Sequence, residues 1–312
     1  MPVNIIPPQP WTGRSDPEDG PDALRLHHLA GKGDANRAVI GFASDAGVAR
    51  NKGRIGAHDG PAAMRKAMAG LAAPQNPVRF TDLGDIEVLG DDLEAGQIAL
   101  SEKLHQNLTQ HGRIIVLGGG HETAFASYSG LAKAYPDKRI GIINLDAHLD
   151  LRLPGGNGPS SGTPFAQIRA LAHEKFDYLC IGVAEESNTQ ALMDRAREWN
   201  VGTVSDHALI ADKHAADDAV SAIIKRSDLV YLTIDIDVLP HFQAPGVSAP
   251  AARGVPLEII EYLVVTVLTE CKKTATPCPL ADIVELSPPH DMQSVTAKSA
   301  ALLARRLLMS AS

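Results

Sequence analysis

The sequence predicts an α/β fold in which helices cover both faces of a mostly parallel β-sheet. Short, continuously apolar runs alternate with amphipathic helical segments, a pattern typical of parallel strands that are buried on both sides. No internal repeat and no linker-like boundary interrupts the 312 residues. We therefore expect a single domain over residues 23–312, preceded by an arm at residues 1–22 that is rich in Pro, Gly and Asp and packs on the surface.

The elements are expected to alternate along the chain. The first strand is the apolar run 37–43, followed by a loop at 44–58. A helix then begins at Gly60-Pro61, because proline suits the first helical turn. The other strands, each a short apolar run, are expected at residues 113–117, 139–145, 177–183, 228–234 and 281–286. The other helices are expected at residues 92–110, 122–134, 188–199, 256–270 and 294–309, with a loop rich in Gly, Pro and Ser at 153–163.

The composition limits the partners and the compartment. With 44% hydrophobic and 21% charged residues, the chain is typical of a soluble globular protein with a sizeable core. A formal net charge of −8 argues against nucleic acid and anionic membranes as partners. Three cysteines without metal-finger spacing, no long apolar stretch and no signal peptide predict a reduced cytoplasmic protein. Cys180 lies in an apolar run and is expected in the core.

Metal-binding residue types follow four of the predicted strands. His121 comes after strand 113–117, Asp146 after 139–145 and Asp235 after 228–234, and Glu285 lies near the end of the strand at 281–286. The carboxyl ends of parallel strands meet at one edge of the sheet, where ligands bind. We therefore expect these distant residues to converge on one site.

The spacing of these residues favours a metal site. Asp146, His148 and Asp150 are separated by two residues each, as are Asp235 and Asp237, so in extended backbone each set shares a face. Together with His121 they offer four carboxylates and two imidazoles, which suit Mn²⁺, Fe²⁺, Zn²⁺ or Ni²⁺ better than Mg²⁺. Two such ions sharing a bridging water lower the pKa of that water to about 7. With four aspartates, neutral histidines and a bridging hydroxide, the centre would carry a charge of about −1 and would tolerate a cationic electrophile such as an amidinium carbon.

Simpler interpretations apply to each residue taken alone. A single aspartate here would be a helix cap or a solvated loop residue, and His121 after three glycines would be a turn residue. Six such residues at strand ends make these interpretations unlikely as a set. The Gly118-Gly119-Gly120 run lacks the ending of a phosphate-binding loop.

Several motifs resemble the arginase/agmatinase (ureohydrolase) family. They are Gly-Gly-Gly-His-Glu at 118–122, Asn-Leu-Asp-Ala-His-Leu-Asp at 144–150, Ser-Gly-Thr-Pro-Phe at 161–165, Thr-Ile-Asp-Ile-Asp-Val at 233–238 and Ala-Pro-Gly-Val-Ser-Ala-Pro at 244–250. The resemblance implies a three-layer α/β/α fold with about eight strands, a homo-oligomer and two Mn²⁺ ions per subunit. It carries the metal-ligand roles onto His121, Asp146, His148, Asp150, Asp235 and Asp237.

Within that family the chain looks most like the branch that hydrolyses N-formimidoyl-L-glutamate to L-glutamate and formamide in histidine degradation. The resembling segments are 11–14, 41–54, 161–165 and 188–189. Ser161 stands where arginases and agmatinases keep a His. The resemblance implies that a metal-bridging hydroxide attacks the amidine carbon, with Asp150 transferring protons and Glu285 stabilising the cationic substrate. The alternatives are a urea-releasing enzyme acting on a guanidine, of agmatinase, guanidinobutyrase or arginase type, and a non-catalytic binding protein.

Formimidoylglutamate has an amidine and two carboxylates, so its pocket needs cationic or hydroxyl donors near the metals. Arginine is the natural partner of a carboxylate because its guanidinium binds both oxygens. The role of Glu185, which follows a predicted strand end, is left open. The candidate donors are Arg54, Arg152, Asn157, Ser160 and Ser161, with Lys52 and Arg253 as weaker candidates.

Overall fold

The computed structural model of the protein describes residues 2–31 and 35–310. Its strands are β1 (Val3–Ile6), β2 (Ala30–Gly31), β3 (Arg37–Ala43), β4 (Phe80–Val88), β5 (Arg113–Leu117), β6 (Ile140–Leu145), β7 (Asp177–Val183), β8 (Gly202–Ser205), β9 (Leu229–Asp235) and β10 (Leu280–Val284). Its α-helices are α1 (Leu26–Leu29), α2 (Ala46–Arg50), α3 (Gly60–Ala69), α4 (Leu93–Leu108), α5 (Thr123–Ala134), α6 (Pro164–Ala172), α7 (Gln190–Glu198), α8 (Asp206–Ala211), α9 (Asp217–Lys225), α10 (Leu257–Thr274) and α11 (Val295–Met309).

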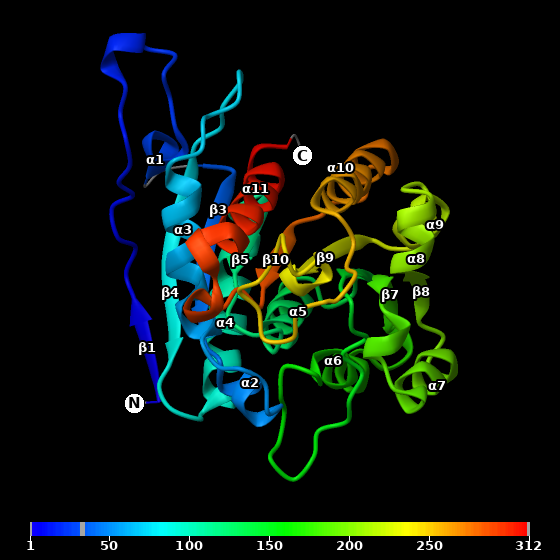
Figure 1. Ribbon diagram of the computed structural model, residues 1–312. Helices are drawn as coiled ribbons and strands as arrows, with labels where there is room; N and C mark the ends of the chain where they lie inside the picture. Colours follow the sequence, from blue (N-terminus) through cyan, green and yellow to red (C-terminus); the bar gives the residue numbers. More distant parts are fainter. Residues whose placement is uncertain (1, 32–34, 311–312) are drawn as a thin grey trace.

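All of these strands belong to one ten-stranded sheet (Figure 1). The strand order is β1-β4-β3-β5-β10-β9-β6-β7-β8, and β2 pairs with β4 off this path. Only the pair between β1 and β4 is antiparallel among the described strands. The predicted mostly parallel sheet is therefore confirmed, with ten strands in place of about eight.

The six strands predicted from apolar runs are present as β3, β5, β6, β7, β9 and β10, but β1, β2, β4 and β8 were not predicted. The segment 1–22 is also more than a surface coil, because its residues Val3–Ile6 form the antiparallel edge strand against β4. The short α2 lies inside the predicted loop 44–58, and α6, α8 and α9 were not predicted either.

Two apolar cores lie on opposite faces of the sheet. Side chains alternate between them along the central strands, so that Val39 and Ile115 belong to one core while Ile40 and Ile114 belong to the other. Helices α3, α9, α10 and α11 pack on the first face, and α4, α5, α6 and α7 pack on the second. This alternation is why the central strands, such as β6 and β9, are almost continuously apolar. Cys180 is fully buried in the second core, as predicted.

The order of the central strands positions the site. β5, β10, β9 and β6 are consecutive neighbours and run parallel, so the segments that follow them emerge side by side at one edge. Gly182 in β7 has φ +107°, and a Cβ there would lie 3.2 Å from the backbone oxygen of Asp146. Among the helices of the described ranges, none combines the length and apolarity that a membrane span needs.

Candidate metal centre

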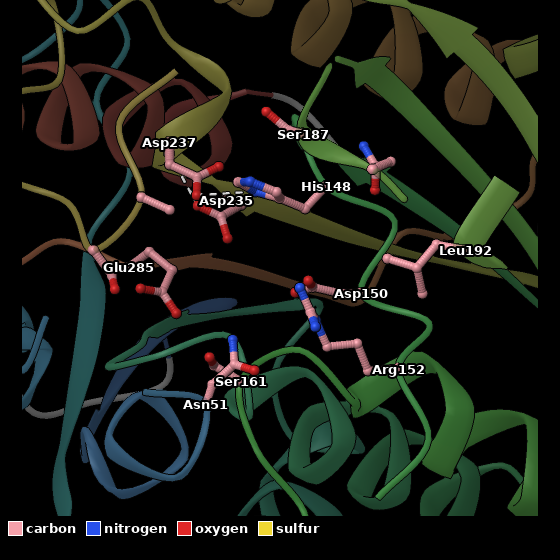
Figure 2. Close-up of a pocket in the computed structure, with 13 residues that line it drawn as sticks. Asn51, His148, Asp150, Arg152, Ser161, Ser187, Leu192, Asp235, Asp237 and Glu285 are labelled. Carbon is pink, nitrogen blue, oxygen red and sulfur yellow. Dashed lines mark hydrogen bonds and ion pairs between the residues drawn. The ribbon is translucent and has the colours of Figure 1, made fainter. Parts of the chain in front are cut away.

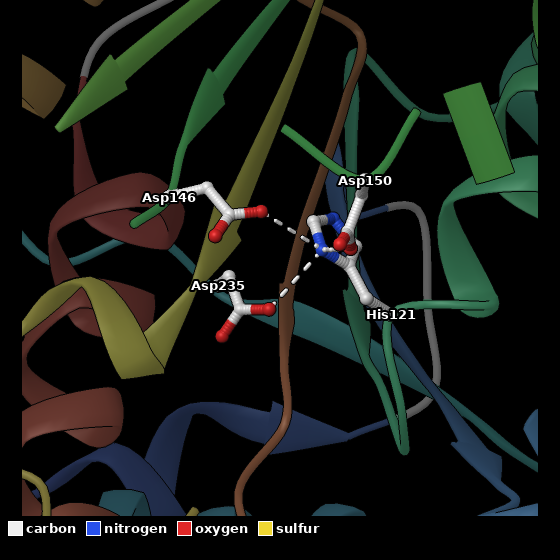
Figure 3. A group of neighbouring side chains, drawn as sticks. All are labelled: His121, Asp146, Asp150 and Asp235. Atoms are coloured by element: carbon white, nitrogen blue, oxygen red, sulfur yellow. Dashed lines mark ion pairs between the residues drawn. The ribbon is translucent and has the colours of Figure 1, made fainter. Parts of the chain in front are cut away.

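The six predicted ligands lie together at the carboxyl edge of the sheet. One group contains His121, Asp146, Asp150 and Asp235, each offering a ligand atom within 4.8 Å of the others. Figure 3 shows the three carboxylates of this group around the imidazole of His121. A second group contains Asp146, His148 and Asp237 under the same criterion. Because Asp146 belongs to both groups, the two candidate cation positions adjoin each other.

The imidazole of His121 is the most informative member of the first group. Its Nδ1 lies 3.2 Å from Asp146 Oδ2, 3.0 Å from Asp150 Oδ2 and 3.1 Å from Asp235 Oδ2. The atom is buried and, among the described residues, has these ion-pair contacts but no hydrogen-bond partner. A buried nitrogen surrounded by three carboxylate oxygens is the arrangement expected of a ligand that faces a cation.

Local hydrogen bonds orient the ligands. The Nε2 of His121 lies 3.1 Å from Thr233 Oγ1, and a partner on the second ring nitrogen fixes how a ligating histidine is oriented. Asp146 accepts a bond of 2.6 Å from the backbone N–H of His148, and Asp235 accepts one of 2.9 Å from that of Asp237. In each of these two segments, the first ligand therefore stabilises the turn that leads to the ligand two residues later.

The electrostatics of the group favour a cation. Burial, together with the nearby Asp237 and Asp146, raises the pKa of Asp235 well above its ordinary value. Burial likewise raises the pKa of Asp237 to about 6, against the lowering effect of His148. Burial would lower the pKa of His121 and His148, but the negative charges of the surrounding aspartates raise both well above the ordinary value. Divalent cations would replace these protons and neutralise the buried carboxylates, so the donor set fits a pair of them.

A pocket of about 150 Å³ opens over the ligands. Asp150, Asp235 and Asp237 line it, and Figure 2 shows their side chains around the same space as Glu285 and Arg152. Asp150 and Glu285 both have left-handed backbone, with φ of 46° and 68°. Glu285 is buried, and burial together with the nearby Asp235 and Glu122 raises its pKa well above the ordinary value.

The predicted substrate-binding residues differ in where they lie. Arg152 and Ser161 line the pocket, and the guanidinium of Arg152 has no hydrogen-bond or ion-pair partner among the described residues. Ser160 is buried beside them, but its side chain is not among those lining the pocket. Asn157 is exposed in the 153–163 loop and is not among the lining residues.

Two of the other predicted cations, Arg54 and Arg253, contact protein groups. Arg54 donates from Nε to the backbone oxygen of Ser248 at 3.1 Å and from Nη2 to that of Val247. Arg253 pairs with Asp206 at 2.8 Å and with Glu186 at 3.0 Å. Lys52 is exposed, and so is Glu185, in the short 3-10 helix that follows β7.

Two asparagines that line the pocket were not predicted as site residues. Asn51 follows α2 and lies close to Arg152, because a Cβ on Gly162 would be 3.2 Å from Asn51 Oδ1 and 2.9 Å from Arg152 Cδ. Asn188 also lines the pocket and lies in the segment that follows β7. Both occur in segments that resemble the family, and this resemblance was the only feature of the sequence that could have pointed to them. Asparagine has no sequence spacing that identifies it as a binding residue.

A parallel α/β sheet whose carboxyl edge carries two adjoining groups of carboxylates and imidazoles defines the class of binuclear metal-dependent hydrolases. Comparison with known proteins agrees with this class. Residues 35–310 match the sequence model described as the arginase family. The chain therefore belongs to the arginase family.

Individual relatives cover almost the whole chain. A formimidoylglutamase of Rhodococcus opacus is 44% identical over 97% of this chain and 96% of its own length. A formimidoylglutamase of Chromobacterium violaceum is 45% identical over 94% of this chain and 95% of its own length. The crystal structure of Trypanosoma cruzi formiminoglutamase with Mn²⁺₂ has a TM-score of 0.79 at 26% identity, covering 92% of this chain and 97% of that one.

Proposed function

We propose that this protein hydrolyses N-formimidoyl-L-glutamate to L-glutamate and formamide, with two Mn²⁺ ions as its resident cofactor. The observation that carries the proposal is the pocket itself, which places anionic groups near Arg152, a cation with no hydrogen-bond or ion-pair partner among the described residues. Asp150, Asp237 and Glu285 suit the cationic amidinium, while Arg152 and Ser161 suit a carboxylate. The names of the relatives support the same substrate.

The reaction breaks the bond between the amidine carbon and the nitrogen of the amino acid. When bound, the Mn²⁺ pair supplies Lewis-acid polarisation and makes water a stronger nucleophile near neutral pH. His121, Asp146, His148, Asp150, Asp235 and Asp237 would hold it.

The protein's own groups handle the proton and the substrate. Asp150 takes the proton that the attacking water loses and returns one to the leaving nitrogen as the carbon–nitrogen bond breaks. Glu285 pairs with the amidinium, and the guanidinium of Arg152 pairs with a substrate carboxylate. Ser161 and Asn51 line the same pocket as Arg152 and offer further hydrogen-bond donors to the substrate.

A substrate panel tests the proposal. Mn²⁺-loaded protein should release formamide from N-formimidoyl-L-glutamate and little or no urea from arginine, agmatine or 4-guanidinobutyrate. Faster urea release from any of these guanidines would overturn the assignment in favour of another ureohydrolase. Metal analysis that finds fewer than about one ion per chain after Mn²⁺ supplementation would favour a non-catalytic binding protein instead.

We also propose that the protein forms a homo-oligomer. The family resemblance supports this, and light scattering during size-exclusion chromatography measures the mass directly. A mass equal to the 33.0 kDa of one chain would contradict it.

A further inference from the structure

The segment that carries three of the six ligands has little regular structure of its own. Asp146, His148 and Asp150 follow β6 within five residues. The backbone N–H of Asp146 still bonds to Ile181 of β7 at 2.9 Å. The backbone oxygen of Ala147 then accepts the N–H of Ala184 at 3.0 Å. After Ala184 the chain that follows β7 turns away into the 3-10 helix Glu185–Ser187.

The side chain of Asn188 continues the ladder where the backbone of β7 leaves it. Its Oδ1 accepts the backbone N–H of Leu149 at 2.9 Å. Its Nδ2 donates to the backbone oxygen of Ala147 at 2.9 Å and to that of Ala184 at 2.8 Å. The amide thus presents one acceptor and one donor to the loop, as the edge of a neighbouring strand would.

These contacts bracket one ligand and precede another. His148 lies between Ala147 and Leu149, and Asp150 follows directly. Asn188 is 7% exposed and all of its amide hydrogen-bonding groups face backbone partners. The assignment of its oxygen and nitrogen follows from the partners, because a flipped amide would meet two carbonyls with its oxygen and an N–H with its nitrogen.

We propose that Asn188 is a positioning residue that holds the backbone on both sides of His148, so that His148 and Asp150 face the metal pair before any metal binds. The partners of metal ligands commonly set metal affinity, and their loss weakens it about 10- to 100-fold. This role concerns the metal centre and not the identity of the substrate. A test of it by Mn²⁺ binding is therefore independent of the proposed reaction.

Two substitutions test this role by Mn²⁺ binding. Asn188→Ala removes all three bonds. Asn188→Asp keeps the shape and the acceptor for Leu149, but its second oxygen meets the carbonyls of Ala147 and Ala184 without a proton to donate. Titration calorimetry with Mn²⁺ should show about 10- to 100-fold weaker binding in both variants, with saturating Mn²⁺ recovering much of the lost kcat. Two ions bound with wild-type affinity in folded Asn188→Asp would overturn the proposal.

A matched control separates positioning from general loss of stability. Asn36 also uses its side chain to join two distant backbone segments, accepting the N–H of Gly112 at 2.6 Å, but at the opposite edge of the sheet. Asn36→Ala should leave Mn²⁺ affinity unchanged even where it lowers the melting temperature. A general destabilising effect of the Asn188 variants would lower the melting temperature with normal Mn²⁺ affinity, and would contradict the proposal.

A measurement on the wild-type chain covers the case in which the variants do not fold. In metal-free protein the backbone amide of Leu149 should exchange its hydrogen slowly, since the bond to Asn188 exists before metal binds. Rapid exchange at Leu149, with protection appearing only after Mn²⁺ is added, would show that the metal organises the loop and would overturn the proposal.

Discussion

The carboxylate of Glu285 accepts a hydrogen bond of 2.8 Å from the backbone N–H of His121, although 164 residues separate the two. The N–H of Glu285 in turn donates to the backbone oxygen of Gly119 at 2.7 Å. These bonds fix the end of β10 against the segment that follows β5. One oxygen of Glu285 is thereby occupied, while its Oε2 is buried without a hydrogen-bond partner among the described residues.

This geometry predicts the effect of Glu285→Gln. The amide oxygen can still accept the N–H of His121, but the charge that pairs with the amidinium is lost. We expect kcat/KM for formimidoylglutamate to fall about 10²- to 10³-fold, as for the loss of one transition-state electrostatic contact. Two Mn²⁺ ions per chain should remain, because Glu285 belongs to neither ligand group. Near-normal kcat/KM would contradict a substrate role for Glu285.

Replacement of Asp150 tests the proton-transfer step. Asp150→Asn removes the group that accepts and returns the proton, and we expect turnover to fall by at least about 10²-fold, even at saturating Mn²⁺. Circular dichroism should show an unchanged fold. Turnover close to that of the unmodified protein would rule out the role given to Asp150.

Arg152 is expected to act on substrate binding. Arg152→Met should raise KM for formimidoylglutamate about 10- to 100-fold with a smaller effect on kcat, as for a lost charge-assisted hydrogen bond. Arg139→Met is the matched control, since Arg139 is an exposed cation before β6, at the opposite end of the strand. An equal rise in KM in both variants would indicate an effect of net charge, and would contradict a direct contact between Arg152 and the substrate.

Mn²⁺ binding should weaken as the pH falls. In the metal-free protein the pKa values of His121 and His148 are well above the ordinary value, as is that of Asp235. Raised pKa values mean that more protons occupy the site at lower pH, and Mn²⁺ must displace them. Affinity should therefore fall about tenfold per pH unit for each proton released. Calorimetry in buffers of different ionisation enthalpy measures those protons, and pH-independent affinity would refute the expectation.

The N-terminal segment offers a separate stability prediction. The indole N–H of Trp11 donates to Asp82 at 2.7 Å, and its ring meets that of Phe80 edge to face at 5.1 Å. Trp11→Phe keeps an aromatic ring but loses the hydrogen bond. Asp82 retains its pairing with Arg65, so we expect the free energy of unfolding to fall by only about 1 kcal/mol. Denaturant titration measures this, and kcat should not change.

The sequence predicted that the six ligands converge, because the carboxyl ends of parallel strands lie at one edge of the sheet. Knowing that each ligand follows a strand was therefore sufficient to place it at the site. It did not predict β4, whose residues include Asp82, Gly84 and Asp85 and which therefore lacks an apolar run. The structure shows why this strand is stable. Arg65 of α3 pairs with Asp82 at 2.8 Å and with Asp85 at 2.6 Å, a compensation that no local pattern reveals.

The positions of the strands did not predict where side chains within loops would point. Arg54 and Arg152 were both candidates in sequence, with Arg54 slightly favoured for the pocket, yet Arg54 contacts the backbone of residues 247–248, whereas Arg152 lines the pocket. The partners of Arg54 lie more than 190 residues away in sequence, so only the folded chain distinguishes the two. Asn188 was missed for a related reason, because its role depends on where β7 ends.

The left-handed backbone at Asp150 and Glu285 has a consequence for how this protein can change. Non-glycine residues in that conformation carry a conformational cost, which glycine would relieve. Glycine, however, would remove the carboxylate that each position contributes to the pocket. Glycine at 285 would also leave the buried N–H of His121 without its acceptor, which offsets the gain. Variants selected only for thermal stability should therefore accumulate glycine at position 150 and lose turnover, so that greater stability comes at the expense of catalysis.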